Sequence, residues 1–149
     1  MQQHLQAGLV RQLGILSQLF QSRAASLLSP LGLSYSQMAL LTHLEANPEG
    51  ATITQLAQAI DIQQPGVSKA VARLEDIDAV STEREPGSPR GKRVHLSATG
   101  RELLASIREA LTPAVDAWFG DSSDAELQDL LQRMQTLSQR IAEQESPGA

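Results

Sequence analysis

Two acid-free basic segments contain the residues of this sequence best suited to bind a charged partner. Lys69 and Arg73 are four residues apart within the first segment, residues 62–74, which contains no Asp or Glu. The second segment, residues 86–101, also lacks acids, and its basic residues are Arg90, Lys92, Arg93 and Arg101. Clustered guanidinium and ammonium groups bind phosphate well, so both segments indicate contact with a nucleic acid.

The charge of the whole chain has the opposite sign to that of these segments. The 149 residues carry a formal net charge of −5, and 41% of them are hydrophobic. The acids gather near the end of the chain, at Asp116, Asp121, Asp124, Glu126, Asp129, Glu143 and Glu145. Because the potential at a surface depends on where the charges lie, a basic middle and an acidic tail still allow local phosphate contact.

The sequence contains no residue pattern that is suited to catalysis or to metal binding. The absence of cysteine excludes disulfides and thiolate chemistry. The three histidines, His4, His43 and His95, lack ligand spacing, and no serine stands in a G-x-S-x-G turn. We therefore expect no catalysis, no metal and no cofactor. With no apolar run long enough to span a bilayer and no leader-like start, the sequence also predicts a cytoplasmic protein without a membrane partner.

Apolar spacing and capping residues predict a chain built mainly of helices. Leucines at helical spacing predict a long first helix that ends before Pro30 and Gly32. Ser34 begins a second helix, Thr52–Gln55 form a capping box for a third, and Pro65 opens a fourth. Two further long helices are expected after Ser97 or Thr99 and after the break at residues 120–123.

A change of period after Leu74 predicts a β-hairpin. Residues 80–85 are strand-like, residues 92–96 alternate with period two, and the Pro- and Gly-rich segment 86–91 joins them. Two short helices followed by a hairpin make a helix-turn-helix with a wing, and its second helix suits the major groove of DNA. The residues expected to contact DNA are Gln63, Gln64, Pro65, Gly66, Ser68, Lys69, Arg73, Arg90, Lys92 and Arg93. We expect Lys69 to read a base, Arg73 to contact phosphate and Arg90 to enter the minor groove.

These segments resemble the MarR family of bacterial winged-helix transcription regulators. The matching stretches are Leu56-Ala57 through Val67-Ser68-Lys69, Arg73-Leu74-Glu75, and residues 90–100 from Arg90 to Gly100. The resemblance implies a dimer with intertwined terminal helices, in which each subunit offers one winged helix to DNA. It also implies a crevice where a small aromatic or phenolic effector binds and releases DNA. Three positions depart from the family's usual pattern: Ser88 replaces an Asp, Asp78 replaces a Gly, and Thr82 replaces a basic residue.

The leucine stripes of the first and last helices exceed what one small core can bury, which favours a dimer interface. The residues expected in that interface are Leu5, Leu9, Leu13, Leu16, Leu127, Leu130, Leu131, Met134, Leu137 and Ile141. Residues 1–33 and 98–149 are thus expected to form a helical dimerisation region, and residues 34–97 the winged helix-turn-helix.

The expected function is that of a homodimeric regulator, most simply a repressor, which binds a pseudo-palindromic double-stranded operator. A winged-helix adaptor that binds protein instead of DNA is the alternative from another class, favoured by the net charge and by Asp78. An enzyme is a distant third.

Overall fold

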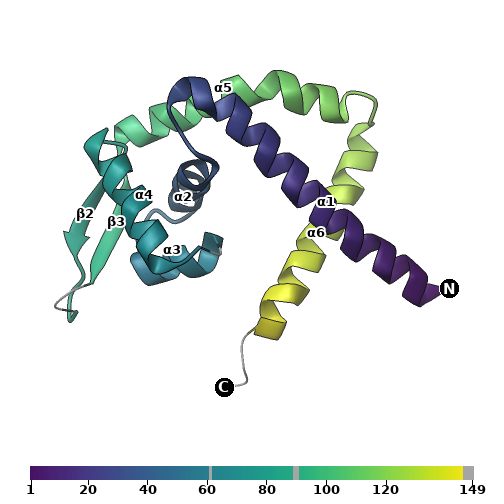
Figure 1. Cartoon of the computed structure of the whole chain (residues 1–149), viewed down its shortest axis with the longest axis horizontal. Coiled ribbons are helices and arrows are strands. Elements are labelled where there is room, and N and C mark those ends of the chain that lie inside the picture. Colours follow the sequence, from purple (N-terminus) through teal and green to yellow (C-terminus); the bar gives the residue numbers. More distant parts are fainter. Residues whose placement is uncertain (61, 89–90, 146–149) are drawn as a thin grey trace. The chain divides into compact units, whose positions relative to one another are not determined.

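A computed structural model of the chain describes residues 1–60, 62–88 and 91–145, in two compact units that meet within one helix (Figure 1). The first unit is Met1–Leu111 and the second begins at Thr112. The helices are α1 (Gln2–Leu28), the short 3-10 helix η1 (Ser29–Leu31), α2 (Tyr35–Ala46), α3 (Ile53–Ile60), α4 (Gln64–Asp76), α5 (Ala98–Phe119) and α6 (Asp124–Glu145). The strands are β1 (Ala51–Thr52), β2 (Val80–Arg84) and β3 (Lys92–Leu96). The prediction of a mainly helical chain with a small β wing is confirmed.

Side-chain caps fix where the helices begin. Ser34 Oγ accepts from the amide of Gln37, and the Gln37 side chain accepts in return from the Ser34 amide. Thr52 and Gln55 exchange the same pair of bonds ahead of α3, as predicted. Each capping box satisfies two amides that a helix start leaves without a partner. These short-range signals explain why the sequence locates the starts of α2 and α3 correctly.

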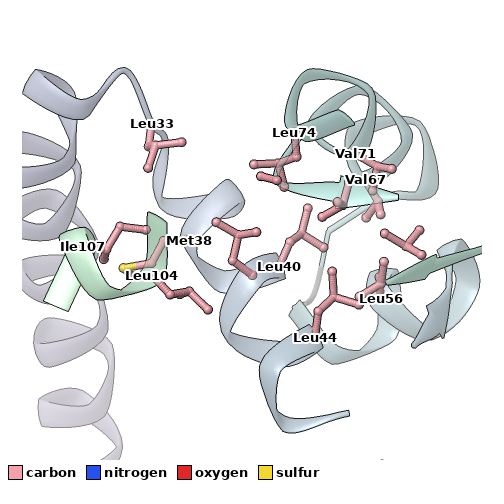
Figure 2. Packing of buried hydrophobic residues seen from close by; sticks show 14 of the residues in the cluster. Leu33, Met38, Leu40, Leu44, Leu56, Val67, Val71, Leu74, Leu104 and Ile107 are labelled. Carbon is pink, nitrogen blue, oxygen red and sulfur yellow. The ribbon is translucent and has the colours of Figure 1, made fainter. Parts of the chain in front are cut away.

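One hydrophobic core unites the winged helix with parts of both long flanking helices (Figure 2). Helix α2 contributes Met38, Leu40, Leu41 and Leu44, all buried. Figure 2 shows side chains of α5 on one side of α2 and those of α3 and α4 on the other. The core also includes Ala24 and Leu28 of α1, so this long helix packs on the winged helix at its C-terminal end.

The sheet has three antiparallel strands in the order β1–β3–β2, one more than the predicted hairpin. The hairpin itself pairs Val80 with Leu96 and Arg84 with Lys92. Strand β1 is only two residues long and pairs Ala51 with Val94. Just before it, Gly50 has φ +79° and lies so close to β3 that a Cβ atom would meet the Val94 carbonyl at 2.6 Å. Glycine is therefore required where the chain enters the sheet.

Asp78 adopts the left-handed conformation, with φ +59°, directly after the C-cap residue Ile77 of α4. The Ala79 amide donates to Leu74 and the Asp78 amide to Glu75, the two bonds of a Schellman motif. Asp is tolerated there because a short polar side chain lowers the cost of positive φ. The departure from glycine at this position thus leaves the helix end intact.

Helix α5 begins against the turn that follows α4. Ser97 Oγ accepts from the Gly100 amide and donates to the Asp78 carbonyl. A Cβ atom at Gly100 would lie 2.1 Å from the Ala79 carbonyl oxygen. The close approach of two backbones fixes how the first turn of α5 meets the root of the wing.

Much of α1 and the whole of α6 expose apolar side chains. In α1, only Ala24 and Leu28 are buried. The exposed large apolar residues at predicted interface positions are Leu5, Leu9, Leu13, Leu16, Leu130, Leu131, Met134, Leu137 and Ile141, while Leu127 is half-buried. Across the described ranges, no helix combines the length and apolarity that crossing a membrane requires.

Candidate nucleic-acid interface

Helix α4 buries one face and presents its predicted contact residues on the surface. Val67, Val71 and Leu74 are buried against the core. The predicted contact residues Gln63, Gln64, Pro65, Gly66, Ser68, Lys69 and Arg73 are all exposed. This division follows from the 3.6-residue period, which places the three apolar residues on one side of the helix.

The start of α4 suits an anionic partner. Its N-cap residue, Gln63, makes no side-chain cap, and Pro65 lies in the first turn. Gln64 Nε2 donates to Thr54 Oγ1 of α3 at 3.2 Å, which holds the two helices of the motif together. The first amides of a helix and its dipole attract phosphate when no side chain caps them.

A hollow of about 400 Å³ lies beside the two cations of α4. Lys69 and Arg73 line one side of this hollow, and Ser34, Ser36 and Gln37 at the start of α2 line another. Neither cation has an ion-pair partner within the part of the chain that the structure describes. Positive charge and hydroxyl donors around one opening are suited to a phosphate group.

The two faces of the wing differ in charge. Because side chains alternate along a strand, Val80, Thr82 and Arg84 share the face that packs toward α4, and Thr82 Oγ1 donates to Glu75 of α4 at 2.9 Å. Lys92 lies directly opposite Arg84 on that face. Neither cation has an acidic partner among the described residues.

The acids of the wing lie on its other face, where each is paired. Glu83 Oε1 is 2.8 Å from His95 Nε2. Glu85 forms a two-pronged ion pair with Arg93, whose Nε and Nη2 donate to the two carboxylate oxygens, each at 2.7 Å. The hydrogen bonds from Arg93 lower the pKa of the Glu85 carboxyl, and the same contact raises the pKa of Arg93. On the face near α4, the wing itself thus contributes cations and no acid among the described residues, and the acid beside that face is Glu75 of α4.

The predicted contact residues of the wing therefore have different surroundings. Lys92 is exposed on the face shared with α4, whereas Arg93 is engaged with Glu85. Arg90 lies outside the described residues. Ser88, which replaces the family's usual Asp, donates its amide to Glu85 and accepts from Gly91 through its hydroxyl, so it serves the turn itself.

Sequence reasoning missed Arg84. Arg84 is not among the predicted contact residues, although period-two alternation from the apolar Val80 places it on the same face as Val80. The register that sets it opposite Lys92 comes from the pairing of β2 with β3. Two like charges directly opposite each other destabilise a hairpin. A binding role for an anion would account for this arrangement.

These elements define a winged helix-turn-helix: α3 and α4 form the motif, and β2 and β3 form the wing. The MarR family model matches residues 31–91, which cover α2 to the end of the wing loop. This match to the winged helix-turn-helix confirms the resemblance found in the sequence.

Solved structures of transcription regulators extend the similarity over nearly the whole chain. A MarR transcriptional regulator from Methanosarcina mazei Go1 has a TM-score of 0.80 at 17% identity and covers 92% of this chain and 98% of its own. The transcriptional regulator BldR from Sulfolobus solfataricus has a TM-score of 0.78 at 20% identity, covering 91% and 95%. A MarR protein from Peptoclostridium difficile DA00132 has a TM-score of 0.75 at 20% identity, covering 91% and 88%. The chain has the fold of MarR-family transcription regulators.

Proposed function

We propose that this protein is a homodimeric transcription regulator that binds double-stranded DNA through α4 and the wing. The observation that carries the proposal is the separation of charge in the winged helix. Lys69, Arg73, Arg84 and Lys92 have no acidic partner among the described residues, while the acids of the wing are paired on its far face. Because DNA attracts local positive charge, the net charge of −5 does not oppose this role.

The roles of the individual residues follow from their positions. Gln63, Gln64, Pro65, Gly66 and Ser68 stand at the start of α4, the end of a recognition helix that approaches base edges and phosphates. Lys69 reads a base edge one turn further along, and Arg73 contacts the backbone. Lys92 and Arg84 neutralise phosphates beside the groove that the wing enters, and Arg90 at the wing tip enters the minor groove.

The exposed apolar stripes of α1 and α6 are best explained as surfaces that a second copy of the chain covers. Leucines dominate both stripes, and a monomer rarely leaves such continuous apolar surface in water. The helices also complement each other in charge. Residues 1–44 contain Arg11 and Arg23 and no acid, whereas α6 begins with Asp124 and Glu126. A twofold dimer would present two α4 helices to half-sites about 34 Å apart, which predicts a pseudo-palindromic operator.

Salt-dependent binding to duplex DNA tests the DNA-binding role. If each subunit neutralises three or four phosphates, the slope of log K against log salt should be about −5 to −7 for the dimer. Arg84→Gln and Lys92→Gln should each make that slope shallower by about two, one phosphate per subunit. Arg140→Gln changes the net charge equally but lies on α6 and not on α4 or the wing, so it should leave the slope unchanged. Absence of binding at low salt would reject the DNA role in favour of a protein-binding adaptor.

Sedimentation tests the dimer. Leu130→Asp combined with Leu137→Asp should give a monomer or an unfolded chain, because each change would bury an unpaired charge in the interface. Gln132→Asp combined with Gln139→Asp adds the same charges with the same spacing to the opposite side of α6 and should leave the dimer intact. A folded dimer of the leucine variant would refute the interface.

Repression and release by a small aromatic or phenolic effector remain predictions of the family resemblance, which titration of the DNA complex with salicylate would probe.

A further inference from the structure

Arg93 is held entirely by contacts within the chain. Its Nε and Nη2 donate to Glu85, and its Nη1 points to the carbonyl oxygens of Gly50, at 3.4 Å, and Glu49, at 3.5 Å. All three guanidinium nitrogens are therefore directed at internal acceptors. The side chains of Arg93 and Glu85 are only 23% and 22% exposed. A phosphate could therefore reach Arg93 only through the N–H groups that these bonds do not use.

The contacts of Arg93 join three separate segments at the base of the wing loop. Glu85 follows the last residue of β2, Arg93 is the second residue of β3, and Gly50 precedes β1. The Glu85 amide also donates to the Gly91 carbonyl at 2.9 Å, which closes the loop at the same level. The ion pair and this backbone bond thus lie together where the loop leaves the sheet.

The negative charge of Glu85 opposes DNA binding, so a favourable role for Glu85 must come from its ion pair with Arg93. A carboxylate on the wing repels DNA phosphates, and by long-range electrostatics alone its removal should strengthen DNA binding. Glu85 nevertheless lies one residue from Arg84, at the point where the loop begins. The lowered pKa of Glu85 means that this pair is ionised throughout the neutral range.

We propose that Glu85 and Arg93 are positioning residues, which hold the wing loop against the turn before β1 and so direct the cations of the wing toward DNA. The ion pair acts through Arg84, Lys92 and the loop between them, and Arg93 itself does not touch DNA. This inference rests on the proposed DNA-binding function. It replaces the expectation that Arg93 is a DNA contact with a role at the base of the wing.

The sign of one charge change distinguishes positioning from simple electrostatics. The probe is a 30-base-pair duplex that the wild-type protein selects from a random-sequence pool. Glu85→Gln should weaken binding to this duplex by about threefold to tenfold, although the change removes a negative charge. Glu83→Gln is the matched control, two residues away on the same face. At pH 8 it should leave affinity unchanged or tighten it by up to about threefold. Equal tightening by both variants would overturn the inference.

A double variant and amide exchange complete the test. If the residues act as a pair, the double variant Glu85→Gln with Arg93→Gln should bind DNA no more weakly than Arg93→Gln alone. Arg93→Gln already removes the ion pair, so the second change has no further effect on it. Additive losses, with a shallower salt slope for Arg93→Gln alone, would make Arg93 a DNA contact and refute the positioning role. Without DNA, the amide at position 85 should exchange faster in Glu85→Gln than in Glu83→Gln, and unchanged exchange would also count against the pair. Failure of the wild-type protein to bind any duplex would instead reject the DNA-binding function on which the inference depends.

Discussion

Asp78→Gly should stabilise this protein, although it removes a side chain. Asp78 has φ +59° and ends α4 in a Schellman motif. An L-residue in this conformation costs about 1–2 kcal/mol, less for Asp than for most residues, so we take about 1 kcal/mol. The Asp carboxylate also lies near the negative end of the α4 dipole, which costs about 0.3–1 kcal/mol.

Glycine has an opposing effect in the unfolded chain. Its greater freedom there reduces the gain by about 0.5–1 kcal/mol. The balance predicts a stabilisation of about 0.3–1.5 kcal/mol, which corresponds to a Tm increase of about 1–6 °C for a chain of this size. The Asp78 carbonyl, which accepts from Ser97 Oγ, belongs to the backbone and is kept.

Two companion variants separate the contributions. Asp78→Asn removes the charge but keeps a side chain that tolerates positive φ, so it should recover only the dipole contribution. Asp78→Ala also removes the charge but fits the left-handed region poorly, and should be the least stable of the three variants. Thermal and urea unfolding at one fixed protein concentration give the order, because dissociation of the proposed dimer would make Tm depend on concentration. An Ala variant as stable as the Gly variant would refute the conformational argument.

Three further predictions concern the wing root, the recognition helix and pH. Gly100→Ala should destabilise the fold by about 1–3 kcal/mol in urea unfolding, since a Cβ atom would lie 2.1 Å from the Ala79 carbonyl; unchanged stability would disprove that close contact. Lys69→Ala should cost about 1–3 kcal/mol of operator affinity and relax preference at one base pair, whereas Arg73→Ala should weaken all sequences alike. Competition titrations with single-base operator variants decide between those two roles. Because the folded-state pKa of Glu85 is lowered, its contribution to stability should be complete at neutral pH and disappear as the pH falls below the ordinary carboxyl range. Unfolding of wild type and of the Gln variant across acidic pH measures this, and a difference that persists at the lowest pH would contradict it.

Local signals in the sequence determined most of the helical framework. The Ser34 and Thr52 capping boxes begin α2 and α3, and helical spacing identifies the buried face of α4 that leaves Lys69 exposed. These features depend on residues that are three or four positions apart, and sequence patterns therefore predict them. The residues of the wing likewise predicted the hairpin and the resemblance to the MarR family.

The surroundings of the wing residues depended on contacts between distant parts of the chain. The pairing of β2 with β3 sets Arg84 opposite Lys92, and the same register turns Glu85 and Arg93 to the other face. A shift of one residue would exchange these faces, since side chains alternate along a strand. The contact of Arg93 with Gly50 joins residues 43 positions apart. A sequence pattern records which residues are charged, but only tertiary packing determines which of them are already paired and which remain available to a partner.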